Sequence, residues 1–180
     1  MKIVNIVASG SFNQKIDLAA LSVLGDRYSY NREKYIGGYI TLSSAKVTVY
    51  RTGNYIITGI KSVESISSLW EELVSLLFTH LDVSLFAPPE VKNMVGQSDL
   101  GRQVNLSKLI VKLRDEDAEY EPEVFPGLIW KTEFGTVNMF QNGKVMLLGC
   151  RSLEELERLE GYVVKKAGVL SFEKQSSQKY

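Results

Sequence analysis

Residues Tyr120 to Leu128, Tyr-Glu-Pro-Glu-Val-Phe-Pro-Gly-Leu, decide how the rest of this chain is interpreted. Prolines and a glycine flank Phe125 directly after an acidic run, so we expect this ring at the tip of a stiff, projecting loop. The first half of the chain contains a counterpart. Four of its residues align with four around the quoted stretch: Tyr30, Glu33, Tyr35 and Gly37 with Tyr120, Glu123, Phe125 and Gly127.

The repeat extends over most of the sequence. At one constant offset, Asn5, Val7, Leu18 and Leu21 match Asn93, Val95, Leu106 and Leu109. After a two-residue insertion, the matching continues with Val47, Gly53, Gly59, Ser62 and Glu64 against Val137, Gly143, Gly149, Ser152 and Glu154. Only two units fit, which predicts a pseudo-symmetric pair. We expect repeat 1 over residues 1–87, repeat 2 over residues 88–170 and a polar tail over residues 171–180.

Length and composition limit the class of protein. A chain of 180 residues, 44% of them hydrophobic, can form one compact domain or two small fused units. The single cysteine, Cys150, leaves no internal disulfide and weakly favours a reducing compartment. Because no signal-peptide core and no membrane-length apolar run occurs, we expect a soluble, intracellular protein without membrane partners. Basic and acidic residues balance at 21 each, which argues against purely electrostatic DNA binding.

Each repeat has the same predicted order of elements. A β-rich run, Ile3 to Ser9 in the first repeat, precedes a short helix. Asp17 is the expected N-cap of a helix from Leu18 to Leu24 that Gly25 closes, and Asn105 is its counterpart before Leu106 to Leu113.

Three strands and a longer helix complete each repeat. The strands of the first repeat are predicted near Tyr39 to Leu42, Val47 to Tyr50 and Tyr55 to Ile60, with hairpin glycines at Gly53 and Gly143. Ser152 and Glu155 form a predicted capping box for the last helix. Helical spacing marks the first repeat's helix: Val63, Ile66, Trp70, Leu73 and Leu77.

The predicted strands are apolar on both faces. Since the helices can cover only one face, the other face should be open, and an apolar surface of this kind usually marks a binding site. A second layer or a dimer partner would also explain it. The residues expected on this face are Val7, Tyr50, Ile56, Val95, Phe140, Met146 and Leu148.

The paired motifs resemble those of TATA-box-binding proteins of archaeal type, from Ile3 to about Leu170. The strongest matches are residues 92–96 (Lys-Asn-Met-Val-Gly), residues 120–128, and residues 140–144 (Phe-Gln-Asn-Gly-Lys) leading to Gly149. The resemblance implies an α+β fold, a pseudo-twofold saddle in which two α/β repeats form one curved antiparallel sheet with helices on the convex face. It also implies the family's own mechanism, in which apolar wedges kink DNA from the minor groove.

By this resemblance, a set of residues is expected to contact promoter DNA. Asn5 and Asn93 correspond to the family's central amide pair, whose donors meet the minor-groove acceptors of A·T pairs. Phe125 and Phe140 match one pair of intercalating phenylalanines, and Tyr35 and Tyr50 occupy the other pair. The full expected set is Asn5, Val7, Tyr35, Tyr50, Thr52, Ile56, Thr58, Asn93, Val95, Phe125, Pro126, Lys131, Phe140, Asn142, Lys144, Met146 and Leu148.

The resemblance also implies protein partners. Glu121, Glu123 and Val124 match the loop that contacts transcription factor B, and an acidic loop suits a basic partner surface. RNA polymerase would be recruited indirectly, and the free protein could form a homodimer. A solvated loop without a partner is the alternative interpretation of these acidic residues.

The first repeat departs from the family pattern. Tyr35 and Tyr50 add hydroxyl groups where phenylalanine is usual, and Thr41 replaces a common phosphate-binding arginine whose counterpart here is Lys131. Further departures occur at Ile36, Thr48, Asn138 and Leu148. We therefore expect the first repeat to be the weaker DNA surface and the preference for TATA sequences to be relaxed.

Three function classes follow from these patterns. The first is a general transcription initiation factor, cytoplasmic and nucleoid-associated in an archaeal cell or nuclear in a eukaryotic one. The second is a divergent paralogue acting as a protein-interaction or regulatory module. An enzyme is disfavoured, because one histidine, one cysteine and no phosphate loop or metal-spaced ligand set are present. No cofactor, metal site or catalytic residue is expected.

Overall fold

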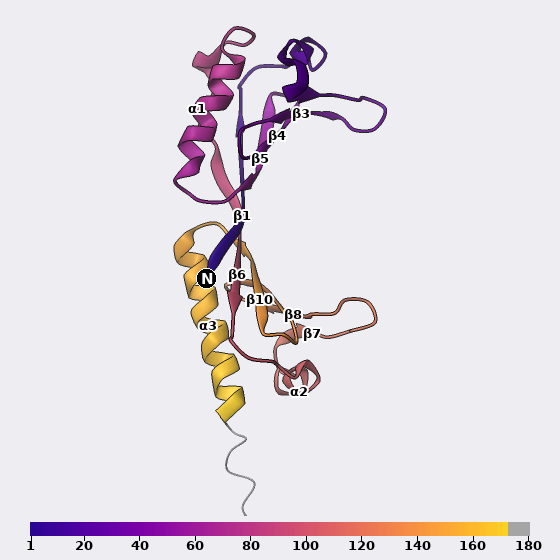
Figure 1. The fold of residues 1–180 in the computed structure, drawn as a ribbon, viewed down its shortest axis with the longest axis vertical. Coiled ribbons are helices and arrows are strands. Elements are labelled where there is room, and N and C mark those ends of the chain that lie inside the picture. Colours follow the sequence, from indigo (N-terminus) through magenta and orange to yellow (C-terminus); the bar gives the residue numbers. More distant parts are fainter. Residues whose placement is uncertain (173–180) are drawn as a thin grey trace, which may run out of the picture. The chain divides into compact units, whose positions relative to one another are not determined.

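The computed structural model describes the backbone of residues 1–172 (Figure 1). The chain divides into two compact units. Residues Val4–Asn93 form the first unit, and Met1–Ile3 together with the chain from Met94 onward form the second. Each unit combines a five-stranded antiparallel sheet with helical segments, so the predicted repeat of one α/β arrangement is present.

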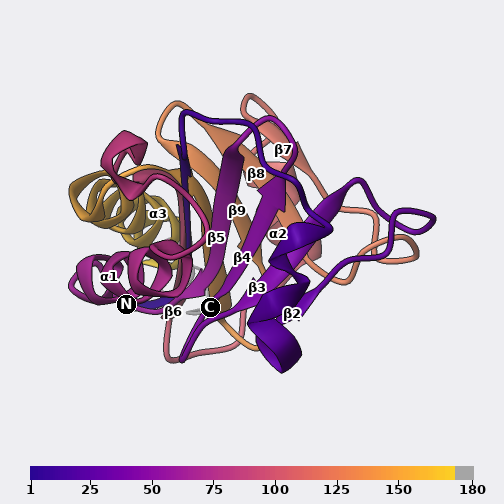
Figure 2. The same cartoon turned by 90° about the horizontal axis from the view of Figure 1, so that it is seen from above.

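The first unit has the strand order β2-β3-β4-β5-β1. A helix packs along one side of these strands, and the loop at residues 30–36 projects from the other side (Figures 1 and 2). The elements are β1 (Lys2–Ser11), the 3-10 helix η1 (Ala20–Arg27), β2 (Tyr28–Ser29), β3 (Gly37–Thr41), β4 (Lys46–Tyr50), β5 (Asn54–Ile60), α1 (Ser65–Leu77) and the 3-10 turn η2 (Val83–Leu85).

The second unit repeats this plan with the strand order β6-β10-β9-β8-β7. Its loop at residues 120–127 projects on the side of the sheet away from α3 (Figure 1). The elements are β6 (Glu90–Asp99), α2 (Leu106–Lys112), β7 (Asp117–Glu119), β8 (Leu128–Thr132), β9 (Gly135–Met139), β10 (Lys144–Cys150) and α3 (Leu153–Phe172).

Strand alternation places the core of each unit between sheet and helix. In β5, Tyr55 and Ile57 are fully buried while Ile56 between them is half-buried. The helices contribute the opposite half of each core, and full burial of one such side chain is worth ~1.5–3 kcal/mol. These helix residues are Leu69, Leu73 and Leu77 in α1 and Leu156, Leu159 and Val163 in α3.

Each central strand pair contains a bulge at the same place in the repeat. The register between β1 and β5 shifts near Gly59, and the register between β6 and β10 shifts near Gly149. Both glycines have φ of 88°, which side chains rarely adopt. The matched glycines of the sequence repeat therefore preserve a backbone conformation that bends both sheets alike.

The caps and hairpins agree with the sequence patterns in most places. Asn105 accepts a hydrogen bond from the Lys108 backbone N–H at 3.0 Å, as expected of an N-cap. The Ser152 hydroxyl accepts a hydrogen bond from the Glu155 backbone N–H. In return, the Glu155 carboxylate accepts from the backbone N–H of Arg151, one residue before the Ser152 N–H that the predicted capping box would use. Gly53 and Gly143 lie in the two hairpin turns with φ of 91° and 85°.

Three local predictions are wrong. Ala20–Arg27 is a 3-10 helix, with Gly25 inside it in a non-helical conformation, where an α-helix from Leu18 to Leu24 was predicted. Val63 precedes α1 and is exposed, so it is not part of the helix face to which it was assigned, whereas Trp70 is half-buried and stacks on the buried Tyr55 with ring centroids 5.8 Å apart. Residues 171 and 172 belong to α3, and the rest of the predicted tail lies outside the described residues.

Candidate nucleic-acid interface

The strand face opposite α1 or α3 in each unit, named here the open face, is not covered by any other described helix or strand of its unit (Figure 1). In β1, Asn5 and Val7 are half-buried while their neighbours Ile6 and Ala8 are fully buried. The same pattern occurs on β6 at Asn93 and Val95, which are half-buried while Met94 and Gly96 are buried. Tyr50, Ile56, Phe140, Met146 and Leu148 are all half-buried as well. The alternation predicted for the strands is confirmed within each unit.

Phe125 and Phe140 form an aromatic pair on the open face of the second unit. Their ring centroids are 5.8 Å apart, with 64° between the ring planes. Both rings lie over Gly127, because a Cβ added there would come within 2.7 Å of Phe125 and 3.0 Å of Phe140. Absence of a side chain at Gly127 therefore makes room for the pair.

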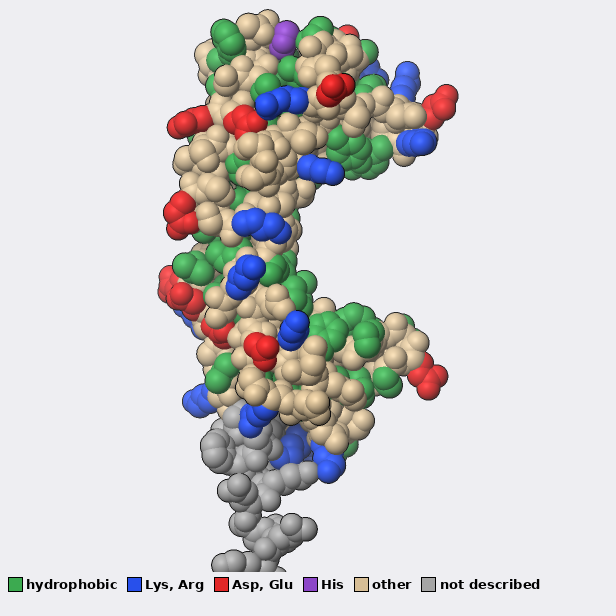
Figure 3. All heavy atoms as spheres, viewed as in Figure 1, with side chains coloured by type: hydrophobic (Ala, Val, Ile, Leu, Met, Phe, Trp, Pro, Cys, Tyr) green, Lys and Arg blue, Asp and Glu red, His purple; other side chains and the backbone are tan. Residues whose placement is uncertain are grey.

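Phe125 does not lie at the tip of its loop, as was predicted. A helical turn at residues 122–124 forms the tip, where Val124 is 81% exposed. The Phe125 N–H donates to the Glu121 carbonyl at 2.9 Å, which turns the ring back toward Phe140. Figure 3 shows hydrophobic side chains gathered at the base of each projecting loop, with charged side chains at its end.

Tyr35 and Tyr50 form the equivalent pair in the first unit. Their ring centroids are 6.3 Å apart, and their hydroxyl oxygens are hydrogen-bonded at 2.9 Å. The hydrogen bond from Tyr35, with burial second, raises the pKa of Tyr50 to about 12. The hydroxyls added by this sequence thus become hydrogen-bonding partners of each other.

Asn5 is tied to the sheet by its side-chain oxygen. The Gly59 backbone N–H, which belongs to the β5 bulge, donates to Asn5 Oδ1 at 2.9 Å. This contact fixes the orientation of the amide and leaves the side-chain N–H groups as the donors that Asn5 can offer on the open face. Asn93 occupies the corresponding position on β6.

The other predicted contact residues lie in strands and turns of the two units. Thr58 on β5 is half-buried, and Thr52, Pro126, Lys131, Asn142 and Lys144 are exposed. Lys131 Nζ lies 3.6 Å from the Asp117 carboxylate. Asn142 uses its Oδ1 within the turn, where it accepts from the Lys144 N–H at 3.0 Å.

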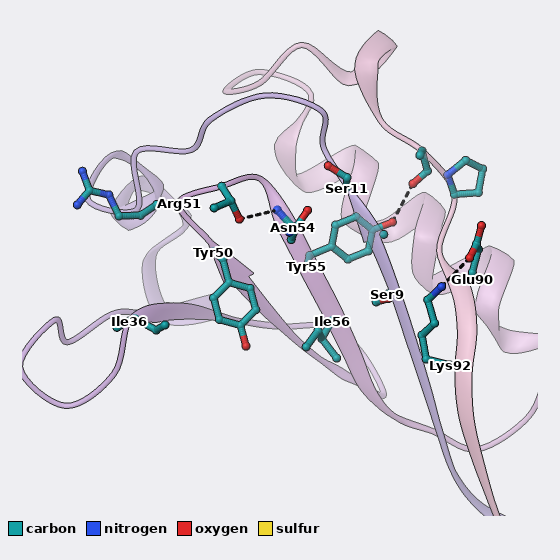
Figure 4. A pocket seen from close by; sticks show the side chains of 14 residues that line it. Ser9, Ser11, Ile36, Tyr50, Arg51, Asn54, Tyr55, Ile56, Glu90 and Lys92 are labelled. Carbon is teal, nitrogen blue, oxygen red and sulfur yellow. Dashed lines mark hydrogen bonds and ion pairs between the residues drawn. The ribbon is translucent and has the colours of Figure 1, made fainter. Parts of the chain in front are cut away.

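An open groove of about 870 Å³ lies beside the tyrosine pair in the first unit (Figure 4). Tyr50 and Ile56 line it together with Ser9, Ile36 and Lys92, which were not among the predicted contact residues. Strand alternation could have identified Ser9, because it follows Asn5 and Val7 on the same face of β1. Ile36 is 73% exposed, and only the loop conformation brings it to the groove.

The acidic stretch before the second-unit loop is partly neutralised. Asp115 pairs with Arg114, Glu116 with Lys166 at 2.5 Å, and Asp117 with Lys131. Lys166 lowers the pKa of Glu116 through their hydrogen bond. The predicted partner-binding residues Glu121, Glu123 and Val124 are exposed, and no ion pair of either glutamate occurs among the described residues.

No three His, Cys, Asp or Glu side chains within residues 1–172 come together in a way that could hold a metal ion. No described helix has the length and apolarity required to cross a membrane.

Comparison with known proteins identifies the family. A family model described as transcription factor TFIID (or TATA-binding protein, TBP) matches residues 1–80 and 88–165. TATA-box-binding protein C of Halobacterium salinarum is 36% identical, over 92% of this chain and 96% of that protein. The TATA-box-binding proteins of Archaeoglobus fulgidus and Methanocaldococcus jannaschii are each 33% identical over 88% of this chain, covering 89% and 88% of those proteins.

A solved structure gives the same result for the fold. The TBP of Methanococcus jannaschii superimposes with a TM-score of 0.76 at 30% identity, over 93% of this chain and 98% of that one. The predicted α+β fold class is thereby confirmed. With both repeats matched by the family model and by archaeal relatives, the chain belongs to the TATA-binding protein family of DNA-binding transcription factors.

Proposed function

We propose that this protein is a general transcription initiation factor that binds and bends the TATA box through the DNA minor groove. The observation that carries the proposal is the pair of aromatic clusters on the open faces. Tyr35 with Tyr50 and Phe125 with Phe140 occupy equivalent places in the two units, each beside a loop glycine. Apolar rings presented in this way act as wedges between base steps, which is the family's mechanism for kinking DNA.

The remaining contact residues have roles that suit a minor groove. Asn5 and Asn93 would donate to adenine N3 and thymine O2, since these are the acceptors that A·T pairs expose there. Apolar side chains between the amides and the rings would pack against the opened groove: Val7, Ile56, Val95, Met146 and Leu148. Thr52, Thr58, Pro126, Lys131, Asn142 and Lys144 would lie against the sugar-phosphate edges or the flanking bases.

We further propose that the second-unit loop recruits transcription factor B and, through it, RNA polymerase. Glu121 and Glu123 are exposed acids at the loop tip, and Val124 adds an apolar contact. Acidic residues around an exposed apolar side chain favour a basic partner surface and increase its rate of association. In an archaeal cell the complex would assemble in the cytoplasm, on the nucleoid.

A gel shift with donor and acceptor dyes on the DNA ends tests this function. A TATA-containing duplex is compared with a scrambled duplex of equal length, with and without transcription factor B. We expect a TATA-selective complex with increased energy transfer, and a further shift with factor B that Glu121→Lys/Glu123→Lys weakens. Absence of bending in both duplexes, even with factor B, would contradict the proposal.

One observation favours a second candidate function, a divergent paralogue with relaxed TATA preference. The Tyr35 and Tyr50 hydroxyls make the first-unit pair of rings polar, whereas the phenylalanines usual at these positions would be wholly apolar. If factor B binds while TATA and scrambled duplexes bind equally, this regulatory role is the correct one. Sedimentation without DNA tests the related proposal that open faces of two copies form a homodimer.

A further inference from the structure

The open face of the first unit carries a third aromatic ring. Tyr39 on β3 stacks on Tyr35, with centroids 5.5 Å apart and 14° between the ring planes, and it is 40% exposed. The repeat places Ile129 at the equivalent position of β8, which pairs with Asn138 as Tyr39 pairs with Thr48. Tyr39, Tyr35 and Tyr50 therefore form a row of three rings, named here the tyrosine row, which the second unit lacks.

The tyrosine row has hydrogen-bonding capacity that the phenylalanine pair lacks. In the Tyr35–Tyr50 contact one hydroxyl donates and the other accepts, so one hydroxyl hydrogen stays available. Both oxygens also keep acceptor capacity. Phe125 and Phe140 have the same ring size and equivalent positions but can neither donate nor accept.

This difference matters for the base pairs that a wedge dehydrates. In the minor groove an A·T pair exposes only acceptors, whereas a G·C pair adds the guanine N2 amino donor. Under two phenylalanines this amino group loses water without gaining an acceptor, which is costly. A tyrosine oxygen can accept from the same amino group, and the available hydroxyl hydrogen can still be donated to an A·T pair.

We propose that the tyrosine row makes the base step at the first unit tolerant of G·C pairs, while the phenylalanine pair of the second unit excludes them. Tyr39 is a positioning residue in this proposal, because its stacked ring holds Tyr35 within hydrogen-bonding distance of Tyr50. The inference rests on the proposed minor-groove binding. It gives each end of the binding site a different sequence requirement, which would orient the complex on a promoter.

Three duplexes test the proposal: an A·T site, and the same site with one G·C pair at either outer step. A cleavage reagent on Val124→Cys identifies the end under the second unit, since Val124 is exposed and Cys150 is buried. We expect G·C to weaken binding about tenfold or more under the phenylalanines and about threefold or less under the tyrosines. Equal penalties at the two ends would overturn the proposal.

Reciprocal variants separate the hydroxyls from the ring positions. Tyr35→Phe/Tyr50→Phe should raise the G·C penalty at the first-unit end and leave the other end unchanged. Phe125→Tyr/Phe140→Tyr should lower the penalty at the second-unit end. If the protein binds none of the duplexes, minor-groove binding itself fails; if it binds all three and these variants change nothing, only the present proposal fails.

Tyr39 has its own matched pair of variants. Tyr39→Phe keeps the stacked ring and should keep the tolerance of G·C pairs at the first-unit end. Tyr39→Ile introduces the residue found at the equivalent position of the second unit, and it should raise the G·C penalty at the first-unit end toward the value measured under the phenylalanines. The phenolate absorbance of Tyr50 should titrate near its raised value in Tyr39→Phe and closer to the ordinary tyrosine pKa of about 10 in Tyr39→Ile. Identical behaviour of the two variants would exclude a positioning role.

Discussion

Asn5 serves the sheet and the proposed DNA contact with different atoms of one amide. Its oxygen accepts the Gly59 N–H inside the β1–β5 bulge, where no regular strand partner can take that hydrogen. Its nitrogen keeps two hydrogens for acceptors on the open face. The residue type is therefore constrained twice, because the position needs an acceptor on one side and donors on the other.

Asn5→Asp separates these two roles. The carboxylate still accepts from Gly59, but it cannot donate to adenine N3 or thymine O2 and it repels phosphate. We expect affinity for a TATA duplex to fall by about tenfold to a hundredfold, from the loss of ~1–3 kcal/mol per base contact, with little change in melting temperature. Asn5→Ala should lower both the affinity for the TATA duplex and the melting temperature.

Fluorescence anisotropy and thermal unfolding measure the two effects. Ser67→Asp, which adds the same charge on an exposed position of α1, is the matched control and should bind DNA normally. Normal binding by Asn5→Asp would show that the Asn5 amide makes no base contact.

Gly127 is a residue at which packing alone predicts a change in function. In Gly127→Ala the new methyl would lie 2.7 Å from Phe125 and 3.0 Å from Phe140, so the rings must move. We expect a stability loss of ~1–3 kcal/mol from overpacking and a smaller DNA bend. The control is Gly161→Ala on exposed α3, where nothing lies within 4 Å and helix propensity should stabilise by ~0.5–1 kcal/mol. An unchanged bend in Gly127→Ala would argue against the wedge.

The two units attach their long helix to the β-hairpin by different interactions. In the first unit, Glu72 of α1 accepts from the Ser43 N–H at 3.1 Å and the Ser43 hydroxyl at 2.7 Å, and pairs with Arg27 at 2.8 Å. At the equivalent helix position of the second unit stands Tyr162, which packs against Trp130 and Phe134. At this helix position the attachment is charged in the first unit and aromatic in the second, so the contact at Glu72 should respond to acid and the contact at Tyr162 should not.

Glu72→Gln tests how much the Glu72 carboxylate contributes to the attachment of α1 to the β-hairpin. Burial raises the pKa of Glu72, but hydrogen bonds from Ser43 and the pairing with Arg27 outweigh it, so the pKa lies below its ordinary value. A lowered carboxyl pKa stabilises the fold above the unfolded pKa of about 4.3, and the effect is lost as pH falls through the folded value. We expect Glu72→Gln to cost ~1 kcal/mol at pH 7 and progressively less toward pH 3.

Amide exchange at Ser43, together with denaturant unfolding at both pH values, measures this effect. Glu71→Gln, on the neighbouring exposed residue, is the control and should change neither quantity. A Glu72→Gln effect of equal size at pH 7 and pH 3 would show that the carboxylate charge does not stabilise the hairpin.

The same elements show how far a sequence can predict a structure. Period-two alternation and paired hairpin glycines identified the strands and their open face, because these patterns are local and each occurs twice. The η1 conformation, the inward turn of Phe125 and the Tyr35–Tyr50 hydrogen bond were not predicted, since each depends on the path of a loop. The Glu72–Ser43 contact joins two segments that are distant in the chain and leaves no local signal.

At the scale of the whole molecule, the charge balance is unusual for a protein proposed to bind DNA. Acidic and basic residues are equal in number, so the chain offers no general attraction to phosphate. Within the proposed contact set the cations are Lys131 and Lys144. Lys131 is already paired with Asp117, whereas Lys144 is exposed and has no ion pair among the described residues. Affinity should therefore depend weakly on salt, with much of that dependence due to Lys144.

Each neutralised phosphate contributes ~0.9 to the slope of log K against log salt concentration. Lys144→Ala should thus reduce the magnitude of the slope by about 1, and Asp117→Ala, which frees Lys131, should increase it and raise affinity at low salt. Lys165→Ala, an exposed position on α3, should leave the slope unchanged. These slopes are measured by anisotropy from 50 to 300 mM salt on one TATA duplex, a range of about sixfold chosen to resolve a change of one unit. A steep slope that Lys165→Ala reduces as much as Lys144→Ala would mean that DNA binds to a charged surface elsewhere, and the open faces would then lose their proposed role.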